Sequence, residues 1–93
     1  MPQYITIHRA PGLREEEVAE NALEVYNGAH ATFLQSYVNL GAGFLVSVYE
    51  AENQDQLEEQ FELFGFPFDE IHEVQFSQSR DEMEQMLKQL GKL

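Results

Sequence analysis

Two strand-like runs on either side of a glycine-containing turn give the clearest pattern in the chain. Residues 32–38 and residues 44–51 are rich in β-branched and aromatic side chains, and successive positions of each run can be assigned to alternate faces. The stretch between them, Asn39–Gly43, contains two glycines, which reach positive φ angles at little steric cost. The pattern predicts a β-hairpin.

The remaining spacing of apolar residues predicts two more strands and three helices. Alternation at Tyr4–His8 and at Ile71–Phe76 indicates strands. The first helical segment has three glutamates in its first turn and ends at Gly28. Asn53 and Ser79, each followed three residues later by Gln or Glu, have the pattern of helix N-caps. We expect helices at residues 14–27, from Asn53 to Gly65, and after Ser79.

The predicted order of elements is β-α-β-β-α-β with one additional helix. This is the order of the ferredoxin-like split βαβ fold, an α+β sandwich. Right-handed crossovers place the first two helices on one face of a four-stranded antiparallel sheet, with the first and third strands in its centre. We therefore expect a single domain over residues 1–93, with the βαββαβ core in residues 1–76 and the extra C-terminal helix in residues 77–93.

Side-chain parity divides the predicted sheet into an aliphatic face and a face that mixes aromatic and polar groups. The aliphatic face is the better candidate for packing under the helices, and it consists of Ile5, Ile7, Val46 and Val48. The face left uncovered is then expected to carry Tyr4, Thr6, His8, Phe33, Gln35, Tyr37, Leu45, Ser47 and Tyr49.

An uncovered face of that kind predicts association with a second copy. More than half of its side chains are large and apolar or aromatic, and monomers rarely leave such a patch in water. We expect two sheets to pack face to face in a twofold homodimer, a dimeric α/β barrel-like assembly. Two alternatives stay open: the C-terminal helix folds across its own sheet as a lid, or it exchanges contacts with the partner subunit.

Composition narrows the classes of partner. The 93 residues include 17 acidic and 5 basic side chains, a formal net charge of −12, which disfavours nucleic acids and anionic membranes. There is no cysteine, so disulfides and thiolate chemistry are absent. No signal peptide and no apolar run of membrane-spanning length is visible, and we expect an acidic, soluble, cytoplasmic protein.

His8 is the most suggestive candidate for site chemistry. We expect it near the end of a central strand, with Tyr49 on the adjacent strand and Glu73 on the other neighbour, and with His72 beside the last strand. Imidazole, phenol and carboxylate together suit a divalent metal or a polar ligand. The alternatives are a partly buried His8 whose ring nitrogens are satisfied by hydrogen bonds, and a His72 that lies at the strand edge.

No motif for catalysis is recognisable. The chain has no nucleophile paired with a base and no glycine-rich phosphate loop. A tyrosine-lined apolar pocket with His8 in its wall would suit a cofactor-independent oxygenase or isomerase acting on a small aromatic substrate. Whether the protein is an enzyme stays open, and the inventory favours a protein that is not.

The chain also resembles a family of small bacterial ferredoxin-like proteins, mostly of unassigned function, that includes nickel-binding members. The residues that carry the resemblance over residues 1–75 are Tyr4, His8, Pro11-Gly12, Ser36-Tyr37-Val38, Val48-Tyr49-Glu50-Ala51, Gly65-Phe66-Pro67 and Asp69-Glu70-Ile71. The resemblance implies a dimeric α/β sandwich and, for some relatives, binding of nickel or similar ions. Among candidate imidazoles only His8 matches, because Gln35, Gln60 and Phe64 stand where relatives often have histidine.

The sequence therefore predicts a homodimeric domain that binds a small ligand or a divalent metal through the surroundings of His8. No cofactor is certain, and nickel is the metal that the resemblance suggests. The first alternative is a structural or regulatory interaction module with no ligand. The second is the cofactor-independent enzyme described above.

Overall fold

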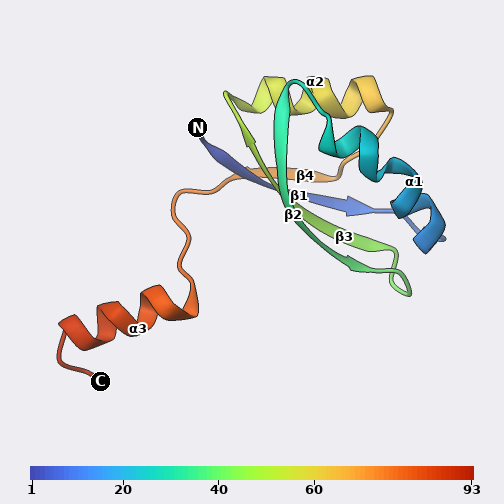
Figure 1. Ribbon diagram of the computed structural model, residues 1–93. Coiled ribbons are helices and arrows are strands. Elements are labelled where there is room, and N and C mark those ends of the chain that lie inside the picture. The colour runs from blue at the N-terminus through green and yellow to red at the C-terminus, as the bar shows by residue number, and fades with distance from the viewer.

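The seven elements follow one another in the order that the hydrophobic pattern predicts. The computed structural model describes residues 1–93, with four strands and three helices in an α+β arrangement consistent with a ferredoxin-like fold (Figure 1). The strands are β1 (Gln3–Arg9), β2 (Ala31–Asn39), β3 (Phe44–Ala51) and β4 (Glu70–Glu73). The helices are α1 (Glu15–Tyr26), α2 (Gln54–Phe64) and α3 (Arg80–Gln89).

The strands form one antiparallel sheet in the order β2-β3-β1-β4, which confirms that the first and third strands are central. Both α1 and α2 lie on the same face of this sheet (Figure 1). β4 is shorter than the predicted strand at Ile71–Phe76. β1 begins at Gln3, and the carbonyl of Gln3 accepts a hydrogen bond from the Val74 N–H at 2.8 Å. The residues after Val74 therefore have no β1 backbone to pair with.

The helix caps predicted at Asn53, Gly65 and Ser79 are confirmed, whereas α1 ends at Tyr26 with Asn27 as its C-cap and Gly28 is not in the left-handed conformation. The side chain of Asn53 accepts a hydrogen bond from the N–H of Gln56 at 2.9 Å. Gly65 ends α2 in the left-handed conformation, with a φ of 70°. Ser79 and Glu82 form a reciprocal capping box at the start of α3.

The prediction of which sheet face the helices cover is wrong. Seven of the nine residues expected on the uncovered face instead face the helices, and four of the seven are 0–4% exposed: Tyr4, Thr6, Ser47 and Tyr49. The physical reason is the packing of aromatic rings under α2. Phe61 of α2 contacts Tyr49 edge to face at a centroid distance of 5.3 Å, which places the tyrosine-bearing parity of the sheet under this helix. His8, Phe33 and Leu45 lie on this same covered side.

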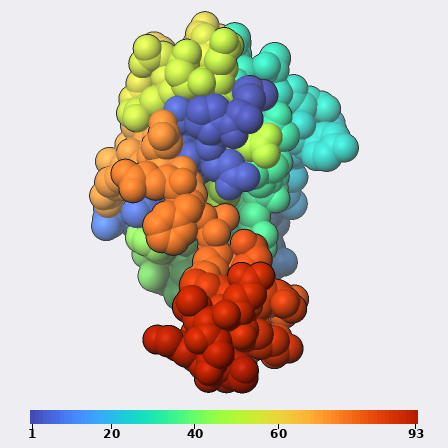
Figure 2. All heavy atoms as spheres, turned by 90° about the vertical axis from the view of Figure 1, so that its left-hand side faces the viewer, coloured from blue at the N-terminus to red at the C-terminus, as the bar shows by residue number.

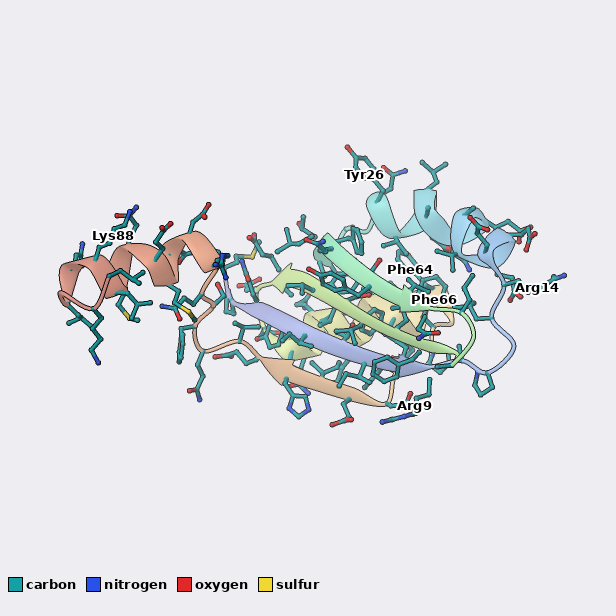
Figure 3. All side chains as sticks on the ribbon, turned by 90° about the horizontal axis from the view of Figure 1, so that it is seen from below. Arg9, Arg14, Tyr26, Phe64, Phe66 and Lys88 are labelled. Carbon is teal, nitrogen blue, oxygen red and sulfur yellow. The ribbon has the colours of Figure 1, made fainter.

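The open face of the sheet is therefore the aliphatic one. We use this name for the side opposite the helices, which carries Ile5, Ile7, Val46, Val48, Gln35 and Tyr37. Figure 3 views the molecule from this side. Ile5 is 36% exposed and Tyr37 is 63% exposed, so an apolar surface still lacks a partner, although its residues differ from those expected.

A β-bulge in β2 explains why Gln35 and Tyr37 lie on the open face while Phe33 does not. The register shifts between Phe33 and Gln35, so that Phe33 lies opposite Tyr49 and Gln35 lies opposite Val48. One extra residue moves the rest of the strand to the other parity. The alternation in the sequence does not reveal such an insertion.

Six residues form the hydrophobic core, and they come from the strands and α2 only. They are Tyr4, Ala31, Tyr49, Ala51, Leu57 and Phe61. Val25 of α1 is half-buried against this cluster. The core is therefore small, and α1 contributes little to it.

Gln60 ties α2 to the start of β2 from inside the core. Its Oε1 accepts hydrogen bonds from the backbone N–H groups of His30 at 3.0 Å and Ala31 at 2.9 Å. Its buried Nε2 has no partner. A side chain at Gly28 would overlap with the Gln60 amide, so a larger residue where α1 connects to β2 would force the Gln60 side chain to move.

α3 projects away from the rest of the molecule (Figures 1 and 2). The radius of gyration is 15.8 Å, compared with about 12 Å for a compact chain of this length. α3 is not packed against the sheet or against either other helix. None of the helices combines the length and the apolar character that crossing a membrane requires.

Candidate functional site

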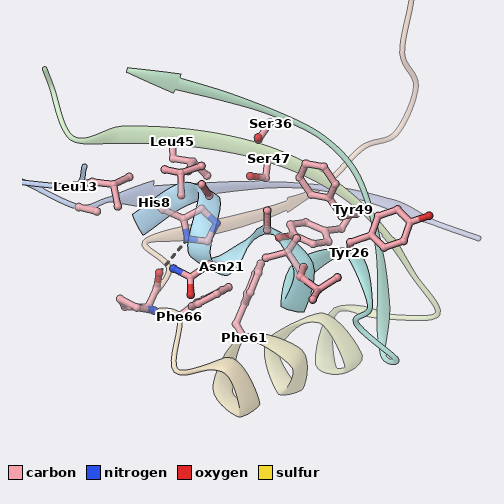
Figure 4. A pocket seen from close by; sticks show the side chains of 18 of the residues that line it. His8, Leu13, Asn21, Tyr26, Ser36, Leu45, Ser47, Tyr49, Phe61 and Phe66 are labelled. Atoms are coloured by element: carbon pink, nitrogen blue, oxygen red, sulfur yellow. Dashed lines mark hydrogen bonds between the residues drawn. The ribbon is translucent and has the colours of Figure 1, made fainter. Parts of the chain in front are cut away.

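A cavity of about 730 Å³ lies between α1 and the covered face of the sheet. Its walls come from β1 and the loop that follows, from one side of α1, from β2 and β3, and from Phe61, Phe66 and Pro67. Figure 4 shows these side chains converging on the space from several elements. Thirteen of the nineteen lining residues are apolar, so the cavity suits a largely apolar occupant.

α1 forms one wall of the cavity because its apolar stripe faces the open space and does not press against the sheet. No residue of α1 is buried, and Val18 and Val25 are half-buried. The opposite side of the helix is acidic. Its first turn contains three glutamates, of which Glu17 pairs with Arg14 at 3.1 Å. The charged side of α1 stays in water, so the apolar stripe on its other side forms the cavity wall.

The hairpin turn fixes the loop that leads into α1. Gly43 has a φ of 62°, and its carbonyl accepts a hydrogen bond from the Ala10 N–H at 2.7 Å. A Cβ atom at this position would collide with the backbone of Ala10 and Pro11. Glycine therefore permits the close approach that holds the start of the α1 connection against the sheet.

His8 is in the cavity wall with both ring nitrogens already bonded. Its Nδ1 lies 2.9 Å from the backbone carbonyl oxygen of Pro67, so Nδ1 carries the proton and donates it. In the neutral ring Nε2 then accepts a hydrogen bond from the Thr6 hydroxyl at 2.8 Å. The ring also meets Phe61 edge to face, with centroids 5.2 Å apart. His8 is thus held as a structural part of the wall.

Other neutral polar groups in the wall are available to an occupant. Burial raises the pKa of Tyr49 to about 12, so its hydroxyl stays protonated at neutral pH and can donate a hydrogen bond. Ser36 and Ser47 lie opposite each other on β2 and β3, and both line the cavity. Asn21 donates its side-chain N–H to the Glu17 carbonyl at 2.9 Å, which leaves its side-chain oxygen as an acceptor.

The cavity wall contains no carboxylate, although 17 of the 93 residues are acidic. Arg9 is the one Arg or Lys residue in the wall. It lies on the strand parity of Ile5 and Ile7, and its guanidinium lies 5.8 Å from the ring centroid of Phe44, its cross-strand neighbour. The side chain is therefore directed toward the open face. The cavity presents apolar and neutral polar groups.

The structure brings together only some of the candidate residues. His8 and Tyr49 contact Phe61 from different strands and line the same cavity. Glu73 lies elsewhere, opposite Tyr4, where burial and the neighbouring carboxylate raise the pKa of the Tyr4 phenol. His72 is exposed on the edge strand and lies 3.0 Å from Glu70. Phe33, Leu45 and Ser47 join His8 and Tyr49 in the cavity wall, while Gln35 and Tyr37 are on the open face.

Sequence reasoning missed the contributions of the helices to the site. Phe61 lies in α2, and its position between His8 and Tyr49 depends on which sheet face the helices cover, the point on which the sequence prediction is wrong. Asn21 lies among the apolar positions of α1 and was not singled out. A polar residue next to that stripe is the signal that could have identified it.

The residues of one chain do not fit a nickel site. No group of three or more His, Cys, Asp or Glu side chains is placed to hold a metal ion. Both His8 nitrogens are bonded within the wall, and His30 Nδ1 lies 3.0 Å from the Gln56 side-chain oxygen. The three histidines belong to three separate parts of the fold. We derive no chemistry through a metal from this arrangement.

Comparison with known proteins relates the chain to one family. A family model described as "Nickel responsive protein SCO4226-like" matches residues 4–74. The crystal structure of SCO4226 from Streptomyces coelicolor A3(2) superposes with a TM-score of 0.71 at 22% sequence identity, over 82% of this chain and 99% of that one. Comparison with curated proteins gives no match.

Proposed function

The chain belongs to the family of SCO4226-like nickel responsive proteins, and from that premise we propose that it binds an uncharged, largely apolar small molecule between α1 and the sheet. The family description refers to nickel and names no organic ligand. The proposal is based on the cavity of this chain. The sequence predicts binding of either a small ligand or a divalent metal near His8. The proposal keeps the small ligand and leaves out the metal.

The observation that carries the proposal is the charge composition of the cavity wall. A chain with 17 acidic residues places none of them around a space of about 730 Å³. Acidic groups close to an apolar ligand would have to lose water when it bound, which costs free energy. Their exclusion makes the space suitable for an uncharged occupant.

The aromatic side chains specify the class of ligand further. Phe33, Tyr49 and Phe61 form edge-to-face pairs with centroid distances of 5.3 to 5.6 Å. A ligand with an aromatic ring can extend this arrangement. The Tyr49 hydroxyl and the Asn21 side-chain oxygen then provide one donor and one acceptor for a polar substituent.

The geometry of His8 supports binding over catalysis. A general base needs a free nitrogen within hydrogen-bonding distance of the proton that it removes. Here Nε2 is occupied by the Thr6 hydroxyl and Nδ1 by the Pro67 carbonyl. His8 consequently acts as a wall residue that holds β1 against the α2–β4 loop.

Titration with N-phenyl-1-naphthylamine tests the proposal. This uncharged aromatic dye becomes more fluorescent in apolar surroundings. We expect saturable binding of one dye per chain. Ala22→Trp should weaken it strongly, because Ala22 of α1 lines the cavity and a Trp side chain would take up part of the space. Leu63→Trp is the matched control, since it adds the same ring at a position of α2 that is 65% exposed and outside this cavity.

A second control separates the cavity from the open face, which is also apolar. Tyr37→Glu adds a charge there and should leave the dye affinity unchanged. If Ala22→Trp binds the dye as tightly as the wild type, or if Tyr37→Glu removes binding while Ala22→Trp does not, the cavity is not the binding site and the proposal fails.

A further inference from the structure

A second, smaller pocket lies where the end of α1 meets α2. Its volume is about 270 Å³, and it shares no lining residue with the cavity between α1 and the sheet. Its wall comes from the last turn of α1, from the connection that leads to β2 and from one side of α2 (Figure 1). We call this space the α1–α2 pocket.

One atom of a wall residue lacks the hydrogen-bond partner that its burial calls for. Gln60 is 1% exposed, and its Nε2 is buried without a partner. The Oε1 of the same amide accepts hydrogen bonds from the N–H groups of His30 at 3.0 Å and Ala31 at 2.9 Å. Exchanging the two ends of the amide would set an NH₂ group against two N–H donors, so Nε2 remains the unpaired end. A buried donor of this kind costs free energy until an acceptor reaches it.

Gly28 lies directly against this amide and belongs to the wall of the same pocket. A Cβ atom at position 28 would overlap with the nitrogen, the oxygen and the carbonyl carbon of the Gln60 amide. Because glycine has no such atom, no side chain at position 28 separates the amide from the α1–α2 pocket.

The end of α1 supplies hydrogen-bond acceptors to the α1–α2 pocket. The N–H groups of Asn27 and Gly28 go to the carbonyls of Leu23 and Val25, so the carbonyl of Glu24 receives neither of these bonds. The last carbonyls of a helix point out of its C-terminal end and carry the negative end of its dipole. The exposed carboxylate of Glu24 adds a full negative charge. This part of the wall therefore suits a hydrogen-bond donor and disfavours an anion.

We propose that the α1–α2 pocket binds a small uncharged molecule that carries a primary carboxamide group. The carbonyl of the ligand accepts a hydrogen bond from Gln60 Nε2, and its NH₂ group donates to the acceptors at the end of α1. A metal cation would leave Nε2 without an acceptor, and a carboxylate would meet the charge of Glu24. Leu63 and Phe64 provide an apolar wall for the rest of the ligand. The competing occupant is an ordered water, which can also donate and accept.

Titration of the ¹⁵N-labelled full-length chain with benzamide tests the proposal, because NMR detects the Nε2–H₂ group of Gln60 directly. We expect saturable shifts of this group and of the backbone amides of Gly28 and Ala29, with a dissociation constant of about 1 mM or lower. Aniline keeps the ring and the NH₂ group but lacks the carbonyl, and benzoate replaces the amide with a charge. Both should bind about tenfold more weakly or worse.

Two variants locate the site. Ala29→Trp adds a ring at an exposed position of the pocket wall and should weaken benzamide binding about tenfold or more. Leu90→Trp is the matched control, because it adds the same ring at a position of α3 that is 62% exposed and outside both cavities. It should bind benzamide as the wild type does. Glu24→Gln removes the charge and should narrow the difference between benzoate and benzamide.

Three results would overturn the proposal. Equal affinities for aniline and benzamide would show that the carbonyl is not recognised. Binding that Ala22→Trp weakens and Ala29→Trp leaves unchanged would place benzamide in the larger cavity. The absence of any saturable shift at Gln60 would leave an ordered water as the only occupant. Because the two spaces share no wall residue, this proposal and the dye-binding proposal can fail separately.

Discussion

The rings of Phe61 and Tyr49 meet edge to face, with centroids 5.3 Å apart and planes at 86°. On its other side Phe61 makes a second edge-to-face contact with His8 at 5.2 Å. One side chain of α2 therefore joins β1 and β3 and also lines the cavity. Stability and the proposed site depend on the same ring.

Phe61→Ala should lower the free energy of unfolding by about 3–5 kcal/mol, because it leaves a void where a residue that is 1% exposed now packs. That is a large part of the stability of a small domain. Urea unfolding followed by circular dichroism measures it. Leu63→Ala on the same helix, where the side chain is 65% exposed, is the control and should change little. Equal unfolding midpoints for the two variants would show that Phe61 is not a core residue.

Local signals in the sequence were sufficient for the elements, since each involves residues close together in the chain. The caps at Asn53, Gly65 and Ser79 lie where the pattern places them. The assignment of the sheet faces failed because both parities carry large apolar groups. Aliphatic character favoured Val46 and Val48 for the covered face, whereas the ring of Phe61 requires aromatic partners there. Parity alone could not resolve this choice.

The cavity could not be predicted for a different reason. Its volume depends on how far α1 stands from the sheet, and that distance is set by tertiary contacts such as the approach of Gly43 to Ala10. The expectation of an apolar pocket with His8 in its wall was nonetheless part of the enzyme alternative. The space exists, but the bonded state of His8 changes what it can do.

Alkaline pH should weaken the fold through Tyr49. Its pKa is about 12 in the folded protein and near 10 when exposed, so the folded state favours the neutral phenol. The stabilisation is complete below pH 10 and is lost as the pH rises from about 10 to about 12. Urea midpoints measured across this range should fall less steeply for Tyr49→Phe than for the wild type. Tyr26→Phe, at a position 80% exposed, should follow the wild type. Parallel curves for all three proteins would contradict the burial of the Tyr49 hydroxyl.

Gln60→Leu should destabilise the protein although it makes the core more apolar. The change removes the acceptor for the N–H groups of His30 and Ala31. Each buried donor left without a partner costs about 1–3 kcal/mol. Hydrogen exchange should show faster exchange at the Ala31 amide in particular. Gln56→Leu is the control, because the Gln56 side chain is bonded only to the His30 side chain and to no backbone N–H group. Unchanged exchange at Ala31 in the Gln60 variant would show that this amide does not depend on the side chain.

Titration of the full-length chain with nickel should give no saturable heat of the kind expected for a low-micromolar site within one chain. The reason is that His8 would have to give up either Thr6 or Pro67 to bind the ion, and no further pair of strong ligands is close by. His8→Ala is the diagnostic variant. Saturable binding by the wild type that disappears in this variant would show that the wall of the cavity rearranges around a metal.

Tyr37→Glu should convert a dimer to a monomer without unfolding the domain. Tyr37 is 63% exposed on the open face and lies opposite Val46, so the folded chain tolerates a charge there. In a dimer that covers the open face, the same carboxylate would be buried without a partner. Sedimentation at micromolar concentration measures the change in mass, and circular dichroism checks the fold. Leu63→Glu adds the same charge at a position of α2 that is 65% exposed and should leave the mass unchanged. If Tyr37→Glu sediments as the wild type does, the open face is not covered by a second copy in solution.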